Sequence, residues 1–449
     1  MLNFIIGRNN SGKTEKIRAL IAERASENKK CILIVPEQFS FESERSILEK
    51  IGAQKMLNVD ILSFTRLAFV INEQYGKALN KTIDDGTRKV LMSLSLEALS
   101  GKLEYFKRFS SKPALLSNLL TFVTELKQCA VTPDEIAEIS GKTGNKSLGK
   151  KLSELSLIAA SYDALVSRSF FDDENLLTIA ADMISETDFF DGKAVYFDAF
   201  CGFTKQERNC IKSILPKAEN VFISLCTDRD LSREGVSVFE NVNSEFSHLK
   251  ECAAEQNVGV SSPEILNVKE DGRSPELVYL EKYLCGEESE PYKEECDNIV
   301  VCAAGNRADE ADFVACEIKK LLRCNPTLRC RNIAVIERTA GTYDKELSES
   351  FKKYGVPMFE DKRRPIGIQP VMVFVKCLLA LCAEGFSTES FMRLLKTGLT
   401  ALSGDEISEL ENYAFLWNID GSKWRRDFTE NPDGLGFDVT EKSQEKLIR

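Results

Sequence analysis

Residues 7–14 constrain the fold of this chain more than any other feature of its sequence. They read Gly-Arg-Asn-Asn-Ser-Gly-Lys-Thr and match the Gly-x-x-x-x-Gly-Lys-Ser/Thr pattern of a phosphate-binding loop. An apolar run at 2–6 precedes them, and Ile17, Leu20 and Ile21 follow at helical spacing. This strand, loop and helix order is the context that such a loop needs, because its backbone amides hold phosphate at the positive end of the helix dipole. We call residues 7–14 the phosphate loop.

Every residue of the phosphate loop is a candidate nucleotide ligand: Gly7, Arg8, Asn9, Asn10, Ser11, Gly12, Lys13 and Thr14. We expect Lys13 to reach the β- and γ-phosphates of ATP and the Thr14 hydroxyl to ligate Mg²⁺. Asp198, which follows the apolar run 194–197, is the natural second magnesium ligand. Two alternatives stay open: a chance match to the pattern, and a loop that no longer binds nucleotide.

Ala199 follows Asp198 at the position where motor ATPases commonly place a glutamate that activates water. We therefore assign no catalytic residue and predict nucleotide binding with little or no hydrolysis. The phosphate loop also begins at Gly7, which leaves no upstream segment to contact adenine. This arrangement predicts weak nucleotide binding or a relaxed base specificity.

Further apolar runs at 31–35 and 59–62 are each followed by helical periodicity, and this alternation predicts a parallel, doubly wound sheet. From 85 to 191 the strand signals stop and only helical patterns remain. The sheet pattern resumes at 194–197 and 221–224. The predicted fold is therefore an α/β P-loop NTPase, with RecA-like parallel sheets and an all-helical insertion.

These patterns predict six segments: a first RecA-like domain in two parts (1–84 and 192–286), a helical insertion subdomain (85–191), a hinge (287–297), a second RecA-like domain (298–385) and the start of a further helical insertion (386–449). The hinge is acidic and contains Pro291. The second domain rests on predicted strands at 299–301 and 333–336 and a helix at 310–322. Because the polar segment 441–449 ends the chain inside a domain, we expect a piece of a longer protein.

The composition narrows the function further. A net charge of −11 argues against a globally basic nucleic-acid binder, so any DNA contact must be a focused site. Fourteen cysteines accompany a single histidine, His248, without any Cys-x-x-Cys pair, which disfavours zinc; Cys31, Cys302 and Cys316 are predicted to be reduced packing residues. The most apolar stretch, 371–382, is too short to span a membrane and predicts a buried helix. Without an export signal, we expect a cytoplasmic protein without membrane contact.

Three segments besides the phosphate loop carry a family pattern: Val-Pro-Glu-Gln-Phe-Ser-Phe-Glu at 35–42, Leu-Ser-Phe-Thr-Arg-Leu-Ala-Phe at 62–69, and Asp-Ala-Phe-Cys-Gly-Phe-Thr at 198–204. Their order and spacing resemble the AddB family. The phosphate loop alone is generic, whereas the Pro-Glu-Gln and Ser-Phe-Thr-Arg-Leu segments together are specific. Further matches extend the resemblance over nearly the whole chain, at 151–155, 172–174, 303–306 and 332–338.

The resemblance implies the N-terminal, helicase-like part of a subunit of the bacterial helicase-nuclease that processes broken DNA. The resemblance also implies a superfamily 1 helicase-like fold. In this family AddA is the motor partner, and AddB uses an inactivated superfamily 1 helicase scaffold to inspect single-stranded DNA for the regulatory Chi sequence. Ala199 agrees with that inactivation. The family's nuclease motif and iron-sulfur cysteines lie mostly beyond the matched region, so we expect neither nuclease activity nor a cluster in this chain.

Positions that match the family's Chi-scanning residues are Gln38, Ser40, Phe64, Arg66, Phe69 and Phe203. Rings stack on unpaired bases at about 1–3 kcal/mol per base, and Gln or Arg supplies hydrogen bonds. Phe69 stands where Trp is common in the family, and Ser40 where Thr is common. These differences affect which DNA sequence would be recognised more than whether these residues form a DNA-binding pocket. The alternative is that the phenylalanines are core residues. Arg338 matches an arginine that senses the γ-phosphate; the alternative is a solvated arginine at a strand end.

Two other functions remain possible from the sequence. One is an active ATP-dependent DNA helicase, which DNA-stimulated phosphate release would reveal. The other is a small-molecule kinase using the same phosphate loop, but that class is usually compact, and a second α/β domain would then have no role.

Overall fold

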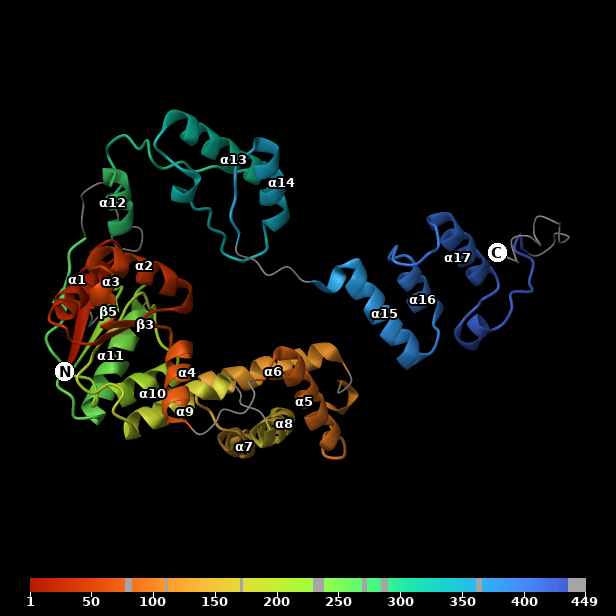
Figure 1. The fold of residues 1–449 in the computed structure, drawn as a ribbon, viewed down its shortest axis with the longest axis horizontal. Coiled ribbons are helices and arrows are strands. Elements are labelled where there is room, and N and C mark those ends of the chain that lie inside the picture. Colours follow the sequence, from red (N-terminus) through yellow and green to blue (C-terminus); the bar gives the residue numbers. More distant parts are fainter. Residues whose placement is uncertain are drawn as a thin grey trace. The chain divides into compact units, whose positions relative to one another are not determined.

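The computed structural model describes residues 1–76, 83–109, 112–169, 173–228, 238–268, 273–283, 290–360 and 366–434 (Figure 1). The chain divides into two units, Met1–Val300 and Val301–Arg449. Three segments singled out in the sequence lie partly or wholly outside the described residues: the 172–174 match, the start of the 287–297 hinge, and the polar end at 441–449.

The first unit is built on a six-stranded, all-parallel sheet, which confirms the predicted α/β class. In chain order its strands are β1 (Leu2–Ile6), β2 (Cys31–Ile34), β3 (Val59–Leu62), β4 (Ala194–Phe197), β5 (Asn220–Leu225) and β6 (Glu264–Ile265). Their spatial order is β3-β2-β4-β5-β1-β6. Although the helical block separates β3 from β4 in the sequence, β4 pairs directly with β2, so one sheet spans both predicted parts.

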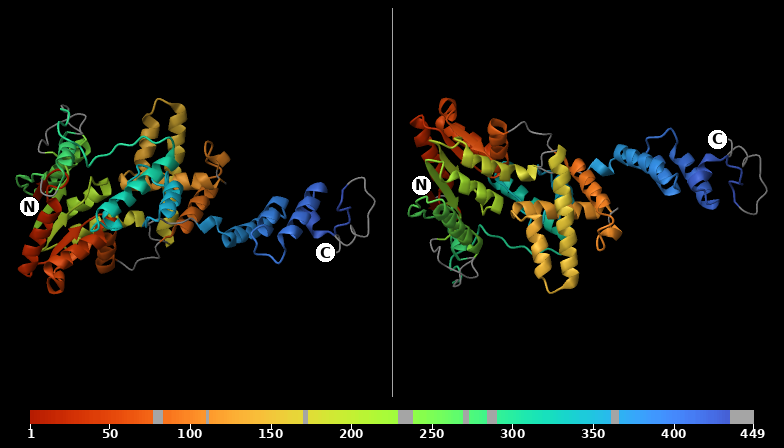
Figure 2. Two further views of the ribbon diagram at one scale, coloured as in Figure 1. Left: turned by 90° about the horizontal axis from the view of Figure 1, so that it is seen from above. Right: turned by 90° about the horizontal axis from the view of Figure 1, so that it is seen from below.

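Helices cover both faces of this sheet (Figure 2). Alternate β1 side chains enter different cores, with Phe4 on one face and Ile5 on the other, as the pleat requires. The Ile5 core is shared with α1 (Lys13–Ser26) and α2 (Ser40–Ile51), next to which lie the short η1 (Glu37–Phe39) and α3 (Ala53–Met56). The Phe4 core is shared with α4 (Phe64–Tyr75), α9 (Asp173–Glu186), α10 (Lys205–Ile214) and α11 (Glu240–Glu255).

Between α4 and α9 the described elements are all helical: α5 (Asp85–Ala98), η2 (Lys107–Phe109), α6 (Pro113–Gln128), α7 (Pro133–Lys142) and α8 (Lys146–Ser169). They share a core of their own that contains Met92, Leu119, Ile158 and Tyr162. A buried carboxylate on α8 fixes the turn before α6, because Glu154 accepts the backbone N–H groups of residues 104, 105 and 106 at 2.8, 2.8 and 3.1 Å.

The second unit contains α13 (Arg307–Cys324), η3 (Cys330–Asn332), α14 (Asp344–Tyr354), η4 (Ile366–Ile368), α15 (Pro370–Glu384), α16 (Thr388–Leu395), α17 (Gly404–Leu416) and η5 (Gly421–Arg425). The predicted helix at 310–322 lies within α13 and is confirmed. The predicted strands at 299–301 and 333–336 are wrong, because neither segment joins a ladder in the part of the chain that the structure describes. Their apolar side chains stay exposed, with Val301 at 93% and Ile336 at 90%.

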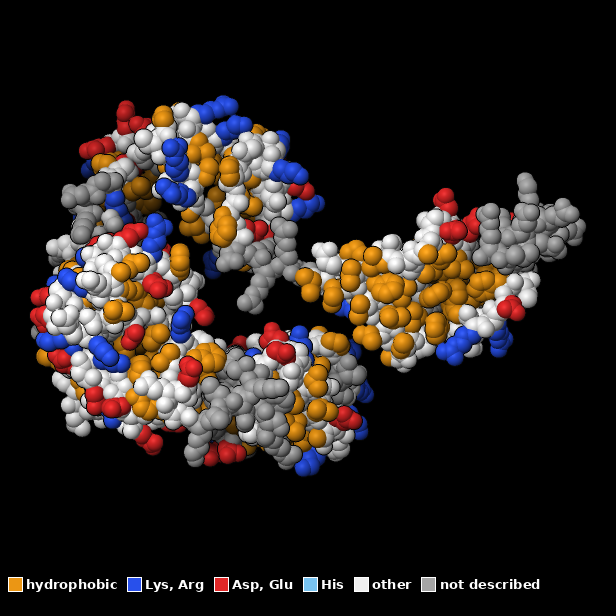
Figure 3. Space-filling view, in the orientation of Figure 1, with side chains coloured by type: hydrophobic (Ala, Val, Ile, Leu, Met, Phe, Trp, Pro, Cys, Tyr) orange, Lys and Arg blue, Asp and Glu red, His pale blue; other side chains and the backbone are white. Residues whose placement is uncertain are grey.

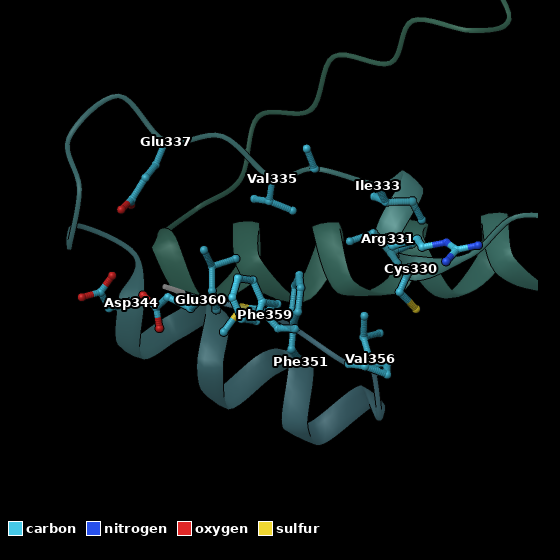
Figure 4. Close-up of a pocket in the computed structure, with 15 residues that line it drawn as sticks. Cys330, Arg331, Ile333, Val335, Glu337, Asp344, Phe351, Val356, Phe359 and Glu360 are labelled. Carbon is cyan, nitrogen blue, oxygen red and sulfur yellow. The ribbon is translucent and has the colours of Figure 1, made fainter. Parts of the chain in front are cut away.

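A cavity lies between α13, α14 and the extended segments at 333–337 and 356–360. Figure 4 shows Ile333 and Val335 on the extended segment above α13, and Phe351, Val356 and Phe359 lower in the view, at the upper edge of α14. These residues line a cavity of about 800 Å³. A β-strand needs a hydrogen-bonded neighbour as well as apolar residues, and the described residues of this unit supply none. The strand prediction was wrong because it rested on the apolar residues alone.

Two further expectations need correction. Cys31 is buried as predicted, and burial raises the pKa of its thiol to about 11, but Cys302 and Cys316 are exposed because the second unit forms no sheet over them in its described residues. Helix α15, expected to be buried, buries Cys377 and exposes other apolar residues; Figure 3 shows hydrophobic side chains gathered over this helical region. Within the described residues, no helix is both long and apolar enough to cross a bilayer.

Candidate nucleotide and nucleic-acid sites

The phosphate loop joins the buried strand β1 to helix α1, as its letters predict. Gly12 precedes the helix in the left-handed region (φ 88°), which favours glycine. Gly7 is required for space, because a Cβ there would stand 2.4 Å from Ser11 Oγ and 2.9 Å from the backbone oxygen of Leu266. The structure therefore explains why both positions of the pattern, 7 and 12, require glycine.

The side chains of the loop fit a phosphate group. Lys13 Nζ donates to the backbone oxygens of Gly7 and Arg8, both at 2.8 Å, so the ammonium lies over the loop. Ser11 is only 3% exposed, and among the described residues its Oγ has no hydrogen-bond partner. A buried hydroxyl without a partner costs about 1–3 kcal/mol, and a phosphate oxygen would remove that cost.

Asp198, the candidate magnesium ligand, lies at the carboxyl end of a central strand. It follows β4 and is buried, and Ser224 Oγ on β5 donates to its Oδ1 at 2.5 Å. Since β4, β5 and β1 are parallel neighbours, Asp198 and Thr14 both lie at the carboxyl edge of the sheet. The described residues contain no group of three or more His, Cys, Asp or Glu that could hold a metal. Magnesium, which usually keeps waters and phosphate oxygens as ligands, does not need such a group.

Ala199 turns the chain sharply after Asp198. Its φ of 65° is in the left-handed region, which is strained for a residue with a Cβ. Its methyl group offers no proton acceptor, and a glutamate at this position would carry the same backbone strain. The geometry therefore agrees with the absence of a water-activating carboxylate at this position.

Arg8 makes contacts that sequence reasoning missed. Its guanidinium binds Asp228 Oδ2 at 3.1 Å and donates to the backbone oxygens of Glu281 and Lys282 at 3.2 and 3.3 Å. These carbonyls belong to the last turn of α12 (Pro275–Tyr283), where helix carbonyls lack partners of their own. The guanidinium also lies 5.4 Å from the centre of the Phe239 ring. Arg8 therefore ties the phosphate loop to α12.

Arg338 is exposed and belongs to the second unit, so its contact with the γ-phosphate stays a prediction.

The predicted DNA-contacting residues lie on loops and helix starts after β2, β3 and β4. These strands are parallel neighbours, so the segments that follow them share the carboxyl edge of the sheet. Gln38 and Arg66 are exposed, whereas Ser40 and Phe69 are half-buried. Local chemistry fixes where the helices start. Ser63 Oγ accepts the Arg66 N–H at 3.2 Å, and a Thr204–Glu207 capping box begins α10.

The structure brings Phe64 and Phe203 together, but inside the core. Their ring centres are 6.1 Å apart, and their exposed fractions are 6% and 7%. Phe200, which sequence reasoning did not assign, joins them at 5.5 and 4.8 Å and is half-buried. Phe64 and Phe203 therefore present no free ring face to a base in this conformation. Phe39 and Phe41, which flank Ser40 in the chain, have exposed rings, and sequence reasoning also left them unassigned.

A buried acid supports the Phe203 turn. Glu245 Oε2 accepts the Phe203 N–H at 3.4 Å and pairs with Arg208 at 3.3 Å. Burial is the main cause that raises the pKa of the Glu245 carboxyl, and the Arg208 charge opposes the shift. Glu245 lies far along the chain from Phe203 in no recognised motif, so the sequence held no signal for this contact.

Comparison with known proteins places these features in a family. A family model described as "ADDB, N-terminal" matches residues 4–281. The chain is 31% identical to a protein from Clostridium novyi (99% of this chain, 40% of that protein), 31% to one from Acetivibrio thermocellus (94% and 37%) and 30% to one from Clostridioides difficile (94% and 37%). By name, each of the three is one subunit of an ATP-dependent helicase/deoxyribonuclease. The chain thus spans about 40% of the length of such relatives.

Proposed function

The chain belongs to the AddB N-terminal family, and from this we propose that it is the helicase-like, DNA-scanning part of a helicase-nuclease subunit. The full protein would act with AddA in the cytoplasm, in the recombination repair of double-strand breaks. Its scaffold would be that of a superfamily 1 P-loop NTPase that no longer serves as the motor.

One observation carries the nucleotide part of this proposal. The phosphate loop keeps Lys13, Thr14 and the unpartnered Ser11 hydroxyl, and the same sheet edge carries Asp198, but Ala199 replaces a water-activating acid. ATP would be held by the loop, with Mg²⁺ between its phosphates, Thr14 and Asp198. Magnesium would neutralise phosphate charge, while no side chain next to Asp198 would activate water.

Single-stranded DNA would lie along the segments that follow β2, β3 and β4. Gln38 and Arg66 are exposed there and can donate hydrogen bonds to bases, and Ser40 and Phe69 line the same edge. Phe64 and Phe203 would hold these segments in place through their ring cluster, or stack on bases after a change of conformation. Chi recognition by this surface is part of the proposal.

Arg66 offers the most direct test of the DNA surface. Arg66→Ala should weaken the binding of a labelled single-stranded oligonucleotide about tenfold, because an exposed guanidinium supplies both charge and hydrogen bonds. Arg45, exposed on α2 and paired with Glu49, provides a matched control, and Arg45→Ala should bind like wild type. In the complex with AddA, Arg66→Ala and Phe203→Ala should reduce pausing at Chi. Wild-type Chi pausing by both variants would refute the surface.

We also propose that residues 298–385 form a second RecA-like domain. The support is their alternation of extended segments with α13 and α14, which lie side by side: Asp312 binds Lys353 at 2.6 Å, and Lys319 Nζ donates to the Tyr354 oxygen at 2.8 Å. Hydrogen exchange would test whether these helices belong to one compact domain, since the amides of α13 and α14 should then be protected together. Fast exchange throughout both helices would count against a domain over 298–385.

A further inference from the structure

We propose that the cavity beside the phosphate loop, closed by α12, holds the nucleoside of the bound nucleotide. The inference rests on the nucleotide binding proposed above and deepens it by naming where the base and ribose lie. Sequence reasoning expected no upstream segment to contact adenine; in this proposal, later parts of the chain supply the walls.

The cavity has a volume of about 360 Å³ and is lined by four segments. Gly7 and Arg8 of the phosphate loop form one wall, and the segments after β5 and β6 form the next two. Helix α12 closes the cavity with Val278 and Glu281. Since β5, β1 and β6 are neighbouring parallel strands, the cavity lies at their carboxyl ends, where open α/β sheets bind ligands.

Its position allows one ligand to occupy both the loop and the cavity. Gly7 lines the cavity, and Lys13 Nζ donates to the Gly7 oxygen. The backbone oxygen of Leu266 also lies so close to Gly7 that a side chain at position 7 would clash with it. A triphosphate held by Lys13 and the loop amides would therefore place its nucleoside next to the segment after β6.

The chemistry of the walls suits a base and a sugar. Leu266, Val268 and Val278 supply apolar surface for a flat ring, and Asn267 and Asp228 supply polar groups at the rim. Arg8 Nε is buried and has no hydrogen-bond partner among the described residues, although the rest of the guanidinium is well bonded. A ribose or phosphate oxygen would satisfy this donor.

An ordinary packing gap is the competing explanation. A hollow that opens to solvent is common at protein surfaces, but a buried donor without a partner is not, because nearly all buried polar groups in proteins are hydrogen-bonded. This cavity has a carboxylate, an amide and an unpartnered guanidinium nitrogen in its walls, as far as the described residues show. These features favour a ligand site.

Calorimetry with magnesium-ATP and with magnesium-tripolyphosphate tests the proposal. Both ligands offer phosphates to Lys13, but only ATP has a nucleoside. The wild-type chain should bind ATP at least about tenfold more tightly than tripolyphosphate. Val278→Trp, which fills the cavity from α12, should remove this preference and leave tripolyphosphate binding unchanged. Leu277→Trp is the matched control, since its side chain is 43% exposed on the same helix outside the cavity lining, and it should behave like wild type.

Asn267→Trp, at the exposed rim, is a second filling variant that keeps the test valid if Val278→Trp fails to fold. Equal affinity of the wild type for ATP and tripolyphosphate, or an unchanged preference in a folded filling variant, would overturn the cavity assignment and leave the phosphate site standing. Binding of neither ligand would overturn the proposed nucleotide function and the cavity together. Lys13→Ala should weaken the binding of ATP and of tripolyphosphate by the same factor. This result would distinguish the phosphate loop from the nucleoside cavity.

Discussion

At the scale of single residues, strain and burial gather around the proposed sites. Ala199 adopts a left-handed conformation after the magnesium-ligand candidate Asp198, and Ser11 and Arg8 each keep a buried polar atom without a partner in the described part of the chain. Such features cost free energy in a protein with no ligand. Ala199, Ser11 and Arg8 all follow strands at the carboxyl edge of one sheet, where a bound ligand could offset these costs.

Ala199→Gly should stabilise the protein. The left-handed conformation costs a residue with a Cβ about 1–2 kcal/mol, and the greater freedom of glycine in the unfolded chain returns part of this. We expect the free energy of unfolding to rise by about 0.5–1 kcal/mol in urea denaturation. Ala164→Gly, in the exposed middle of α8, should instead lower it by about 1 kcal/mol. A loss of stability in Ala199→Gly would contradict the strain.

Glu245 should make stability depend on pH. Its pKa in the folded protein lies above its ordinary value of 4.5, so the folded state binds the proton more tightly than the unfolded state. Stability from this group is therefore present at low pH and is lost as pH rises through the raised pKa. The unfolding free energy of wild type minus that of Glu245→Gln should fall as pH rises above about 4.5, the ordinary pKa of a glutamate carboxyl. A pH-independent difference would show that the carboxyl does not shift.

At the scale of elements, the five longer strands of the first unit were predictable because each is a short apolar run. Strand β6 was missed, since it has two residues at a sheet edge and both are exposed. The false strands at 299–301 and 333–336 show the converse, because an apolar run becomes a strand only beside a partner. The phosphate loop could be predicted from its sequence motif. The contacts of Arg8 with Asp228 and Glu281 could not be predicted, because these residues lie 220 and 273 positions away in the sequence.

The helical insertion should lose stability without its buried acid. Glu154→Ala leaves three backbone N–H groups at 104–106 without their acceptor, at a cost of about 1–3 kcal/mol or more. Because α5, α6 and α8 have their own core, hydrogen exchange should speed up there while β1 and β5 stay protected. Glu138→Ala, at an exposed ion pair on α7, should change little. Uniform loss of protection across the first unit would contradict a separate insertion core.

At the scale of the whole molecule, an acidic chain with a net charge of −11 could bind DNA or nucleotide only where the fold focuses suitable groups. The carboxyl edge of the first sheet gathers the phosphate loop, Asp198 and the segments that carry Gln38 and Arg66. This edge supports the proposal of a helicase scaffold that inspects DNA. The 287–297 hinge stays a prediction; residues 290–297, its described part, form no helix or strand.

The central claim is that this scaffold binds ATP without turning it over. The direct measurement records magnesium-ATP binding by calorimetry and phosphate release on the same preparation, with and without single-stranded DNA. We predict saturable binding that Lys13→Ala weakens strongly, together with phosphate release no higher than that of Lys13→Ala whether or not DNA is present. Phosphate release that DNA stimulates well above the Lys13→Ala level would contradict the account and identify the chain as an active ATPase.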